Sequence, residues 1–304
     1  MIGYSNGAAL AMEYALARMQ GEALPQVDRV VLLSPAIGVA RLAALAVWQG
    51  RVSVWLDSPK AGWNDMGPEY DPYKYKSFAV NAGDQVYRLT QVIARRLDEL
   101  GKSGPVHGVP RILAFQSIAD ATVSTPAVID ALFRRLAPEG HQLVLFDINR
   151  YAEAAELFAP GALVVKENLL DGPPLPFDLT VLGNADSESF TVDAFERPAQ
   201  EQGHARRPTG LAWPRGVYSL SHVALPFSPE DPVYGARPPA AAALLYLGRP
   251  ELRGERGLLA MPANDLIRLR HNPFFGYVQA CVEVFLDESG GSCAGVLAPA
   301  SGRL

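Results

Sequence analysis

The sequence has 304 residues, of which 49% are hydrophobic and 19% are charged, and its mean hydropathy is +0.05. This balance predicts a globular chain with a sizeable core, and we expect one large domain with a long insertion. The formal net charge of −5 argues against a nucleic-acid-binding protein, which normally presents a basic face. No apolar run approaches the roughly 18 residues that a membrane span needs, and the two cysteines (Cys281 and Cys293) give no disulfide framework or metal motif.

The first seven residues contain the pattern G-x-S-x-G, with Ser5 between Gly3 and Gly7. This spacing is typical of a nucleophile elbow, in which a serine occupies a sharp turn between a strand and a helix. The serine is strained there, and the two glycines are expected because both flanking positions should approach closely. A glycine-rich turn without chemistry is the alternative interpretation.

The sequence after the turn agrees with an elbow. Residues 8–17 are rich in helix formers, with Leu10, Tyr14 and Ala17 along one face. The next apolar run, Val27–Ser34, predicts a fully buried parallel strand because it is short and rich in valine and leucine.

The segment from Val39 to Gly104 has a different character. Val39–Gln49 is apolar almost all round, and tryptophan, tyrosine and phenylalanine residues then mix with prolines up to Phe78. This composition indicates a loop-rich cover over an apolar cleft, or equally a local aromatic core. Asp84–Leu100 repeats apolar residues every three or four positions, which predicts a helix that ends at Gly101.

Two further strands are predicted after this helix. Pro110–Ser117 is the first, and Asp120 lies in the loop directly after it, before a helix at Pro126–Leu136. The alternative interpretation of Asp120 is an Asx-turn or helix N-terminal residue. Gln142–Asp147 is the second strand, and a long insertion follows it at about 149–214, with Phe177–Gly183 as an added edge strand.

Gly216–Phe227 reads as a short strand-like run that delivers His222 just before apolar residues. The other histidines have competing explanations: His107 and His141 precede strands, His204 lies in a charged loop, and His271 lies in a basic stretch. Pro273–Leu286 predicts a C-terminal amphipathic helix, and the tail from Ser289 is expected to fray.

Taken together, these residues resemble the α/β-hydrolase superfamily. The stretch from Gly3 to Ala8 is similar to the G-[YHF]-S-x-G-[GA] turn of its esterase, lipase and lysophospholipase-like members. The loop around Asp120 is similar to the family's G-x-x-D-x-x-V loop, with Ser117 in place of the usual glycine. Ser5, Asp120 and His222 also follow one another in the family's chain order.

The resemblance implies an α/β fold, with a mostly parallel sheet, flanking helices and an inserted lid. It divides the chain into the elbow and following strand (1–38), the lid or cap (39–104) and the rest of the core (105–304). Only Met1 and Ile2 precede the elbow, so we expect the chain to be the C-terminal portion of a longer hydrolase, without the N-terminal strands. On its own it is expected to be poorly active or inactive.

The resemblance also implies a chemistry, namely hydrolysis of a carboxylic ester with Ser5 as nucleophile, His222 as base and Asp120 as the acid that orients it. The backbone N–H of Asn6 would be one oxyanion-hole donor. No metal or organic cofactor is implied. The aromatic cover favours an acyl or lipid-like small-molecule ester, and it suggests a transient contact of the lid with a membrane surface.

Two alternatives remain open at this stage. The first is an aminopeptidase or an acyltransferase that uses the same three residues, because one fold hosts many chemistries. The second is a non-catalytic remnant that keeps the fold for contacts with a partner. The sequence as given has no signal peptide, and it determines neither the compartment nor the oligomeric state.

Overall fold

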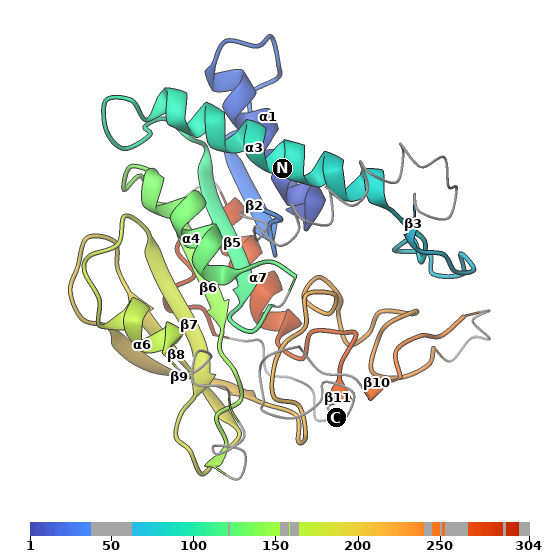
Figure 1. Cartoon of the computed structure of the whole chain (residues 1–304). Helices are drawn as coiled ribbons and strands as arrows, with labels where there is room; N and C mark the ends of the chain where they lie inside the picture. The colour runs from blue at the N-terminus through green and yellow to red at the C-terminus, as the bar shows by residue number, and fades with distance from the viewer. Residues whose placement is uncertain are drawn as a thin grey trace.

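The computed structural model describes residues 1–37, 63–120, 122–152, 158, 164–239, 245–249, 251–252, 267–287 and 290–297. Within them, a seven-stranded sheet has the order β1-β2-β5-β6-β7-β8-β9 (Figure 1). Neighbouring strands from β1 to β7 pair in parallel, and the last two pairs are antiparallel. The strands are β1 (Ile2–Tyr4), β2 (Arg29–Leu33), β5 (Arg111–Ser117), β6 (Gln142–Phe146), β7 (Asp178–Asn184), β8 (Thr191–Arg197) and β9 (Ala205–Ala212).

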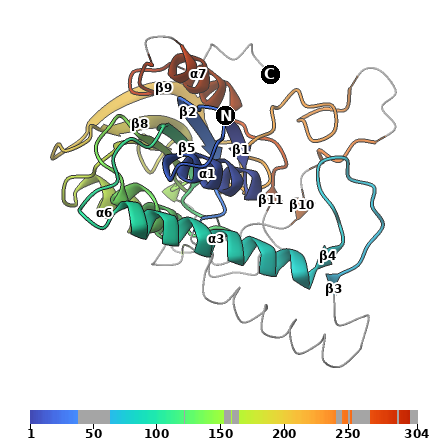
Figure 2. The ribbon, with the colours of Figure 1, turned by 90° about the horizontal axis from the view of Figure 1, so that it is seen from above.

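Helices cover both faces of this sheet. One face carries α1 (Asn6–Met19), α3 (Val80–Leu100), α4 (Thr125–Ala131) and α6 (Val165–Leu170), and a 3-10 turn (Phe133–Arg135) follows α4. The other face carries α7 (Phe275–Leu286), and Figure 2 shows α7 and α3 on opposite sides of the strands. The predicted fold class, a mostly parallel sheet with flanking helices, is confirmed.

The parallel strands are short apolar runs because both of their faces are buried. In β2, Val30 and Leu32 pack in the core beneath α1, whereas Val31 packs in the core beneath α7. The residues of β5 alternate between the two cores in the same way. A strand with two buried faces loses the apolar–polar alternation of a surface strand, which is why these segments were recognisable in the sequence.

The face that α1 buries differs from the predicted one. Leu10 is 53% exposed, and the buried stripe instead passes through Ala8, Met12 and Leu16. The small alanines of this helix let it lie close to β1 and β2, so packing selects the alanine-rich side rather than the side with the largest residues. On α1, Glu13 accepts a hydrogen bond of 2.9 Å from Arg96 of α3, which joins the two helices.

The predicted lid is described only in part, and the apolar segment Val39–Gln49 lies outside the described residues. Residues 63–104 form a small ribbon of β3 (Trp63–Asp65) and β4 (Phe78–Ala79), followed by α3. The loop between β3 and β4 contacts the segment after His222: Tyr73 Oη donates to Asp231 Oδ2 at 3.1 Å, and the Tyr73 ring packs in a tilted arrangement 4.7 Å from that of Phe227. A second ribbon pairs β10 (Glu251–Leu252) with β11 (Ile267–Arg268).

The predicted insertion at 149–214 contains β7, β8 and β9 of the main sheet. A strand is present where Phe177–Gly183 predicted one, but β7 is not an edge strand because β8 pairs along its other side. The prediction of a strand-like run at Gly216–Phe227 is wrong, since these residues form turns and irregular structure. Their backbone groups bond to other loops: the carbonyl of Tyr218, for example, accepts from the Asn149 N–H at 2.8 Å.

The C-terminal helix is confirmed as α7, but the described part of the tail is not frayed. Cys293 is buried, and its N–H donates to Gln142 Oε1 at 2.9 Å. This bond holds residues 290–297 against the start of β6. Cys281 and Cys293 are both free and buried.

His141, at the entry to β6, predicts an acid-sensitive contribution to stability. The side chain is fully buried, its Nδ1 accepts from the Ile112 N–H at 3.3 Å, and burial lowers its pKa from 6.5 to about 4. Since the unfolded chain binds a proton below about pH 6.5 and the folded chain does so only below about pH 4, protonation favours unfolding between these values. We therefore expect the free energy of unfolding to fall by about 3 kcal/mol across this window because of His141 alone.

Urea denaturation of the wild type and of His141→Asn at several pH values measures this contribution. The asparagine keeps an acceptor for the Ile112 N–H but does not titrate. The difference in unfolding free energy between the two proteins should therefore change between pH 6.5 and 4 and stay constant above pH 7. A difference that is the same at every pH would contradict the prediction.

Candidate active site

Ser5 lies at the turn between β1 and α1 and has a left-handed backbone, with φ 53° and ψ −117°. The surrounding backbone fixes this conformation: the Ser5 N–H donates to Leu33 O at 2.9 Å, and its carbonyl accepts from the Ala8 and Ala36 N–H groups at 3.1 and 3.0 Å. A non-glycine residue persists in such a conformation only where its neighbours hold it in place. The strand–turn–helix elbow predicted from the sequence is thus the local structure around Ser5.

The turn places Ser5 at the N-terminus of α1. Asn6 is the first residue of this helix, so its N–H belongs to the group of amides that have no acceptor within a helix. The aligned peptide dipoles make this end partially positive. A negative charge that develops on an oxygen beside Ser5 would therefore be stabilised by the Asn6 amide and by the helix end.

Gly3 and Gly7 differ in what packs against them. A Cβ atom at Gly3 would lie 2.5 Å from the carbonyl oxygen of Gly7 and 2.6 Å from the Cα of Ala8, both of which are backbone atoms. At Gly7, apart from its chain neighbours and the backbone of its own helix, nothing in the described part of the chain lies within 4 Å of a Cβ position. The expectation that close approach requires both glycines is right for Gly3 and wrong for Gly7.

This difference predicts opposite outcomes for two alanine substitutions. Gly3→Ala is expected to lower the free energy of unfolding by roughly 1–3 kcal/mol or more, because the methyl group must push α1 away from β1. Gly7→Ala is expected to be neutral or to stabilise by up to about 1 kcal/mol, because alanine favours a helix more than glycine does. Urea denaturation of both variants checks this, and equal losses would contradict it.

Asp120 follows β5. This strand pairs with β2, whose Leu33 carbonyl accepts the Ser5 N–H. The Asp120 carboxylate is fully buried, and Oδ1 accepts from the backbone N–H groups of Thr122 and Val123 at 2.8 and 2.9 Å. This is the Asx-type turn that the sequence offered as an alternative role. It does not exclude a second role, because the other oxygen, Oδ2, faces His222.

His222 lies between Ser5 and Asp120. Its Nδ1 is 2.9 Å from Asp120 Oδ2, and its Nε2 is 3.1 Å from Ser5 Oγ. A carboxylate can only accept, so Nδ1 carries the proton and Nε2 is left to accept from the serine hydroxyl. The structure therefore brings together the three side chains that the sequence singled out, although they are far apart along the chain.

Neighbouring segments hold the loop that carries His222. The Ser221 hydroxyl donates to Leu269 O at 3.1 Å, and the Asn272 N–H donates to Phe227 O at 2.7 Å. On the other side, Tyr4 Oη donates to the His222 carbonyl at 3.3 Å, and the two rings lie 5.2 Å apart. Burial raises the pKa of Tyr4, and the charge of Asp120 adds to this, so Tyr4 acts here as a neutral donor.

The other histidines take no part in this arrangement. His107 is exposed and binds Glu139 at 2.8 Å, and His204 lies 3.7 Å from Asp171. His141 is the buried residue at the entry to β6, and burial lowers the pKa of His271. Asp147, the other carboxylate that ends a strand, binds Arg150 at 2.7 Å.

Sequence reasoning missed two residues that touch these groups. Tyr4 was treated only as the variable position of the elbow, yet it contacts His222. Gln116 was treated as part of a strand, yet it contacts Asp120. A buried polar side chain near the end of an otherwise apolar strand was the signal that could have identified Gln116.

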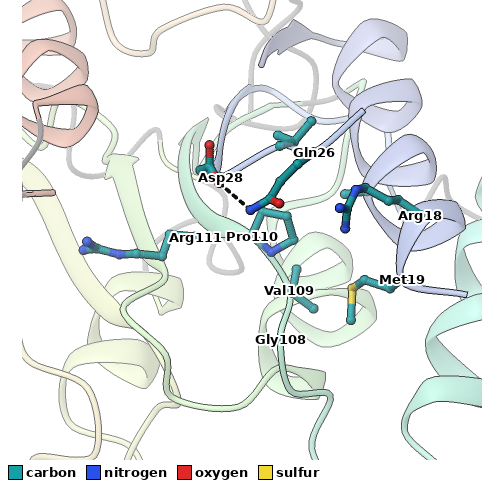
Figure 3. A pocket seen from close by; sticks show the side chains of 10 residues that line it. Arg18, Met19, Gln26, Asp28, Gly108, Val109, Pro110 and Arg111 are labelled. Carbon is teal, nitrogen blue, oxygen red and sulfur yellow. Dashed lines mark hydrogen bonds between the residues drawn. The ribbon is translucent and has the colours of Figure 1, made fainter. Parts of the chain in front are cut away.

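No cluster of three or more histidine, cysteine, aspartate or glutamate side chains suited to a metal ion occurs among the described residues. Within the same residues, no helix is both long and apolar enough to span a bilayer. A pocket of about 300 Å³ lies where α1 ends and where β2 and β5 begin, between Arg18, Gln26 and Val109 (Figure 3). This is the end of the strands opposite to Ser5, so the pocket is not part of the candidate site.

No protein-family model and no curated protein matches this chain. Among solved structures it is similar to a monoacylglycerol lipase of Paleococcus ferrophilus, with 20% identity and a TM-score of 0.31 over 48% of this chain and 56% of that one. It is also similar to the "Putative hydrolase" of Agrobacterium vitis S4, with 16% identity and a TM-score of 0.29 over 47% and 50% of the two chains. The chain thus spans about half the length of these proteins.

Likenesses this distant carry no argument about activity. The class of the protein rests on its own structure, which is an α/β fold with a serine on a strand–turn–helix elbow and a histidine and an aspartate beside it.

Proposed function

We propose that this protein is a serine hydrolase of the α/β-hydrolase type that cleaves carboxylic esters. The observation that carries the proposal is the chain of contacts from Ser5 Oγ to His222 Nε2 and from His222 Nδ1 to Asp120 Oδ2, at 3.1 and 2.9 Å. A serine hydroxyl is a weak nucleophile until a base lies within hydrogen-bond reach. The left-handed backbone of Ser5 and its place at the end of α1 fit the same role.

In the proposed reaction, Ser5 Oγ attacks the ester carbonyl carbon while His222 Nε2 takes the hydroxyl proton. The Asn6 N–H stabilises the negative charge that forms on the carbonyl oxygen. When the carbon–oxygen bond to the alcohol breaks, His222 returns the proton to the leaving alkoxide and an acyl-serine remains. Water then attacks this acyl group with His222 again as base, and the acid and free Ser5 are released.

The environment of the site favours an acyl or lipid-like substrate. We call residues 63–78 the aromatic segment, since large hydrophobic side chains are exposed along it: Trp63, Met66, Tyr70, Tyr73, Tyr75 and Phe78. Lys76 Nζ lies 4.8 Å from the centre of the Tyr70 ring. Rings beside cationic side chains suit the boundary between lipid tails and headgroups. The segment also contacts the loop that carries His222, through Tyr73 and Phe227.

A fluorophosphonate probe tests the activity of Ser5, since a single covalent event is enough for detection and turnover is not required. We expect one labelled serine, identified as Ser5 by mass spectrometry, and hydrolysis of p-nitrophenyl esters that improves from acetate to octanoate. Failure of the probe to modify the folded protein would reject the proposal. Faster cleavage of aminoacyl p-nitroanilides than of the esters would instead favour an aminopeptidase.

The aromatic segment predicts binding to a lipid surface. We expect the protein to co-sediment with vesicles that contain a fraction of anionic phospholipid, and the double variant Met66→Ser, Tyr75→Ser to bind several-fold less, because these are the most exposed of the large side chains listed above. Leu286→Ser is the matched control, since Leu286 is also exposed but lies at the end of α7. Equal binding by the wild type and the double variant would contradict this part of the proposal.

A further inference from the structure

Gln116 is a fully buried polar residue near the carboxyl end of β5. The two cores alternate along this strand, and the even-numbered residues Ile112 and Ala114 face α1 and α4. Gln116 continues this side, four residues before Asp120. Its neighbours on the same face are apolar, so an amide here needs a specific partner to compensate for the loss of water.

The Gln116 amide nitrogen has two partners, and both are acceptors. Nε2 lies 3.0 Å from Asp120 Oδ2 and 3.1 Å from Val123 O. A carboxylate and a carbonyl cannot donate, so this contact fixes the side chain with its NH2 group toward Asp120. Oε1 is buried and has no hydrogen-bond partner among the described residues.

The bond to Asp120 falls on the same oxygen that faces His222. Oδ1 accepts hydrogen bonds from the N–H groups of Thr122 and Val123, and Oδ2 accepts hydrogen bonds from Gln116 Nε2 and His222 Nδ1. Four donors therefore surround the carboxylate, two on each oxygen. The backbone pair fixes one oxygen, and Gln116 fixes the rotation that presents the other oxygen to the imidazole.

We infer that Gln116 is a positioning residue, which holds the carboxylate of Asp120 aimed at His222 Nδ1. The inference rests on the proposed ester hydrolysis, since Gln116 bonds to Asp120 and Val123 and acts on His222 only through Asp120. The Gln116 hydrogen bond also shares the negative charge on Oδ2.

The decisive variant is Gln116→Met, which keeps the size of the side chain and removes both donors. We expect kcat for p-nitrophenyl butyrate to fall about tenfold with little change in KM, as expected for loss of a hydrogen bond to a charged group that acts only through orientation.

Gln116→Glu gives a second test with the same side-chain shape. When protonated, the introduced carboxyl can donate one hydrogen bond to Asp120 Oδ2, and when ionised it repels that oxygen. Activity relative to the wild type should therefore decline as pH rises. If Gln116→Met does not fold, the pH dependence of Gln116→Glu alone tests the role of Gln116. Thermal melting of each variant shows whether it is folded.

Gln142→Met is the matched control. Gln142 is a buried glutamine on the adjacent strand β6, but it bonds to Gly291 O and to the Cys293 N–H. We expect this variant to lose stability and to keep the wild-type pH profile and kcat. If Gln116→Met keeps the kcat of the control and Gln116→Glu keeps its pH profile, Gln116 has only a structural role and the inference is overturned.

A proton NMR readout separates this inference from the proposed function. The His222 Nδ1–H, held by a buried carboxylate, should give a low-field resonance that shifts in Gln116→Met and not in Gln142→Met. A wild type that resists the fluorophosphonate but shows this shift would reject the hydrolase proposal and keep the positioning contact. A reactive wild type whose resonance and kcat are unchanged in Gln116→Met would do the reverse.

Discussion

Replacement of Ser5 by alanine is expected to abolish covalent labelling by the fluorophosphonate and to lower kcat for ester hydrolysis by roughly 10⁴- to 10⁶-fold. The loss is this large because the hydroxyl 3.1 Å from His222 Nε2 is the proposed nucleophile, and without it no acyl-serine can form. The fold should survive, because the elbow conformation is fixed by backbone bonds to Leu33, Ala8 and Ala36 and not by the hydroxyl.

Ser34→Ala is the control for this substitution. Ser34 follows the adjacent strand β2, is fully buried and also has a positive φ, of 42°. Its hydroxyl has no hydrogen-bond partner among the described residues, so its removal should leave labelling unchanged. Mass-spectrometric detection of probe on the Ser5→Ala variant would mean that another serine is the nucleophile.

The second large effect is expected from Asp120→Asn, which should reduce kcat by about 10⁴-fold while the protein stays folded. The four donors around the carboxylate explain why. An amide can offer its oxygen to the Thr122 and Val123 N–H groups or to Gln116 and His222, but not to both pairs. With its NH2 group toward His222, it would force the imidazole into the tautomer whose Nε2 cannot accept the Ser5 proton.

Asp147→Asn provides the comparison for Asp120→Asn. Asp147 is also fully buried at the end of a strand, and burial raises its pKa although Arg150 lies beside it. Because it lies against Arg150 and not against His222, its replacement should affect stability more than kcat. Steady-state kinetics and urea denaturation of both variants separate the two roles. Equal activities for the two would show that Asp120 is not the acid.

The residues of the candidate site were predictable from the sequence where a local motif and the order of residues along the chain indicated the same role. Ser5 was recognisable because a G-x-S-x-G turn before a helix has few other uses, and Asp120 because it follows a buried strand. Parallel strands bring their carboxyl ends to one edge of the sheet, so β1, β2 and β5 place these loops side by side. His222 was recognisable from its chain order and from the residues around it, although the strand expected to carry it is absent.

The parts that were missed depend on contacts that no local pattern encodes. The contact of Gln116 with Asp120 requires the rotation of one side chain in a packed core. The buried side of α1 was misjudged because its alanines pack better than Leu10 does. The start of α3 was placed at Asp84 rather than Val80, since the residue before the helix, Ala79, offers no side-chain cap as a signal. In β9, most side chains are exposed, so its pairing depends on β8 rather than on its own composition.

The wide spacing of the three residues has a consequence for how the protein folds. His222 is 217 positions from Ser5 and 102 from Asp120, so none of their contacts can form within a local segment. Folds with many such distant contacts form slowly, because the chain loses the entropy of closing a long loop before each contact can stabilise it. Reactivity of the serine should therefore be among the last properties to return during refolding, and it reports completion of the native state more faithfully than the recovery of helical circular dichroism.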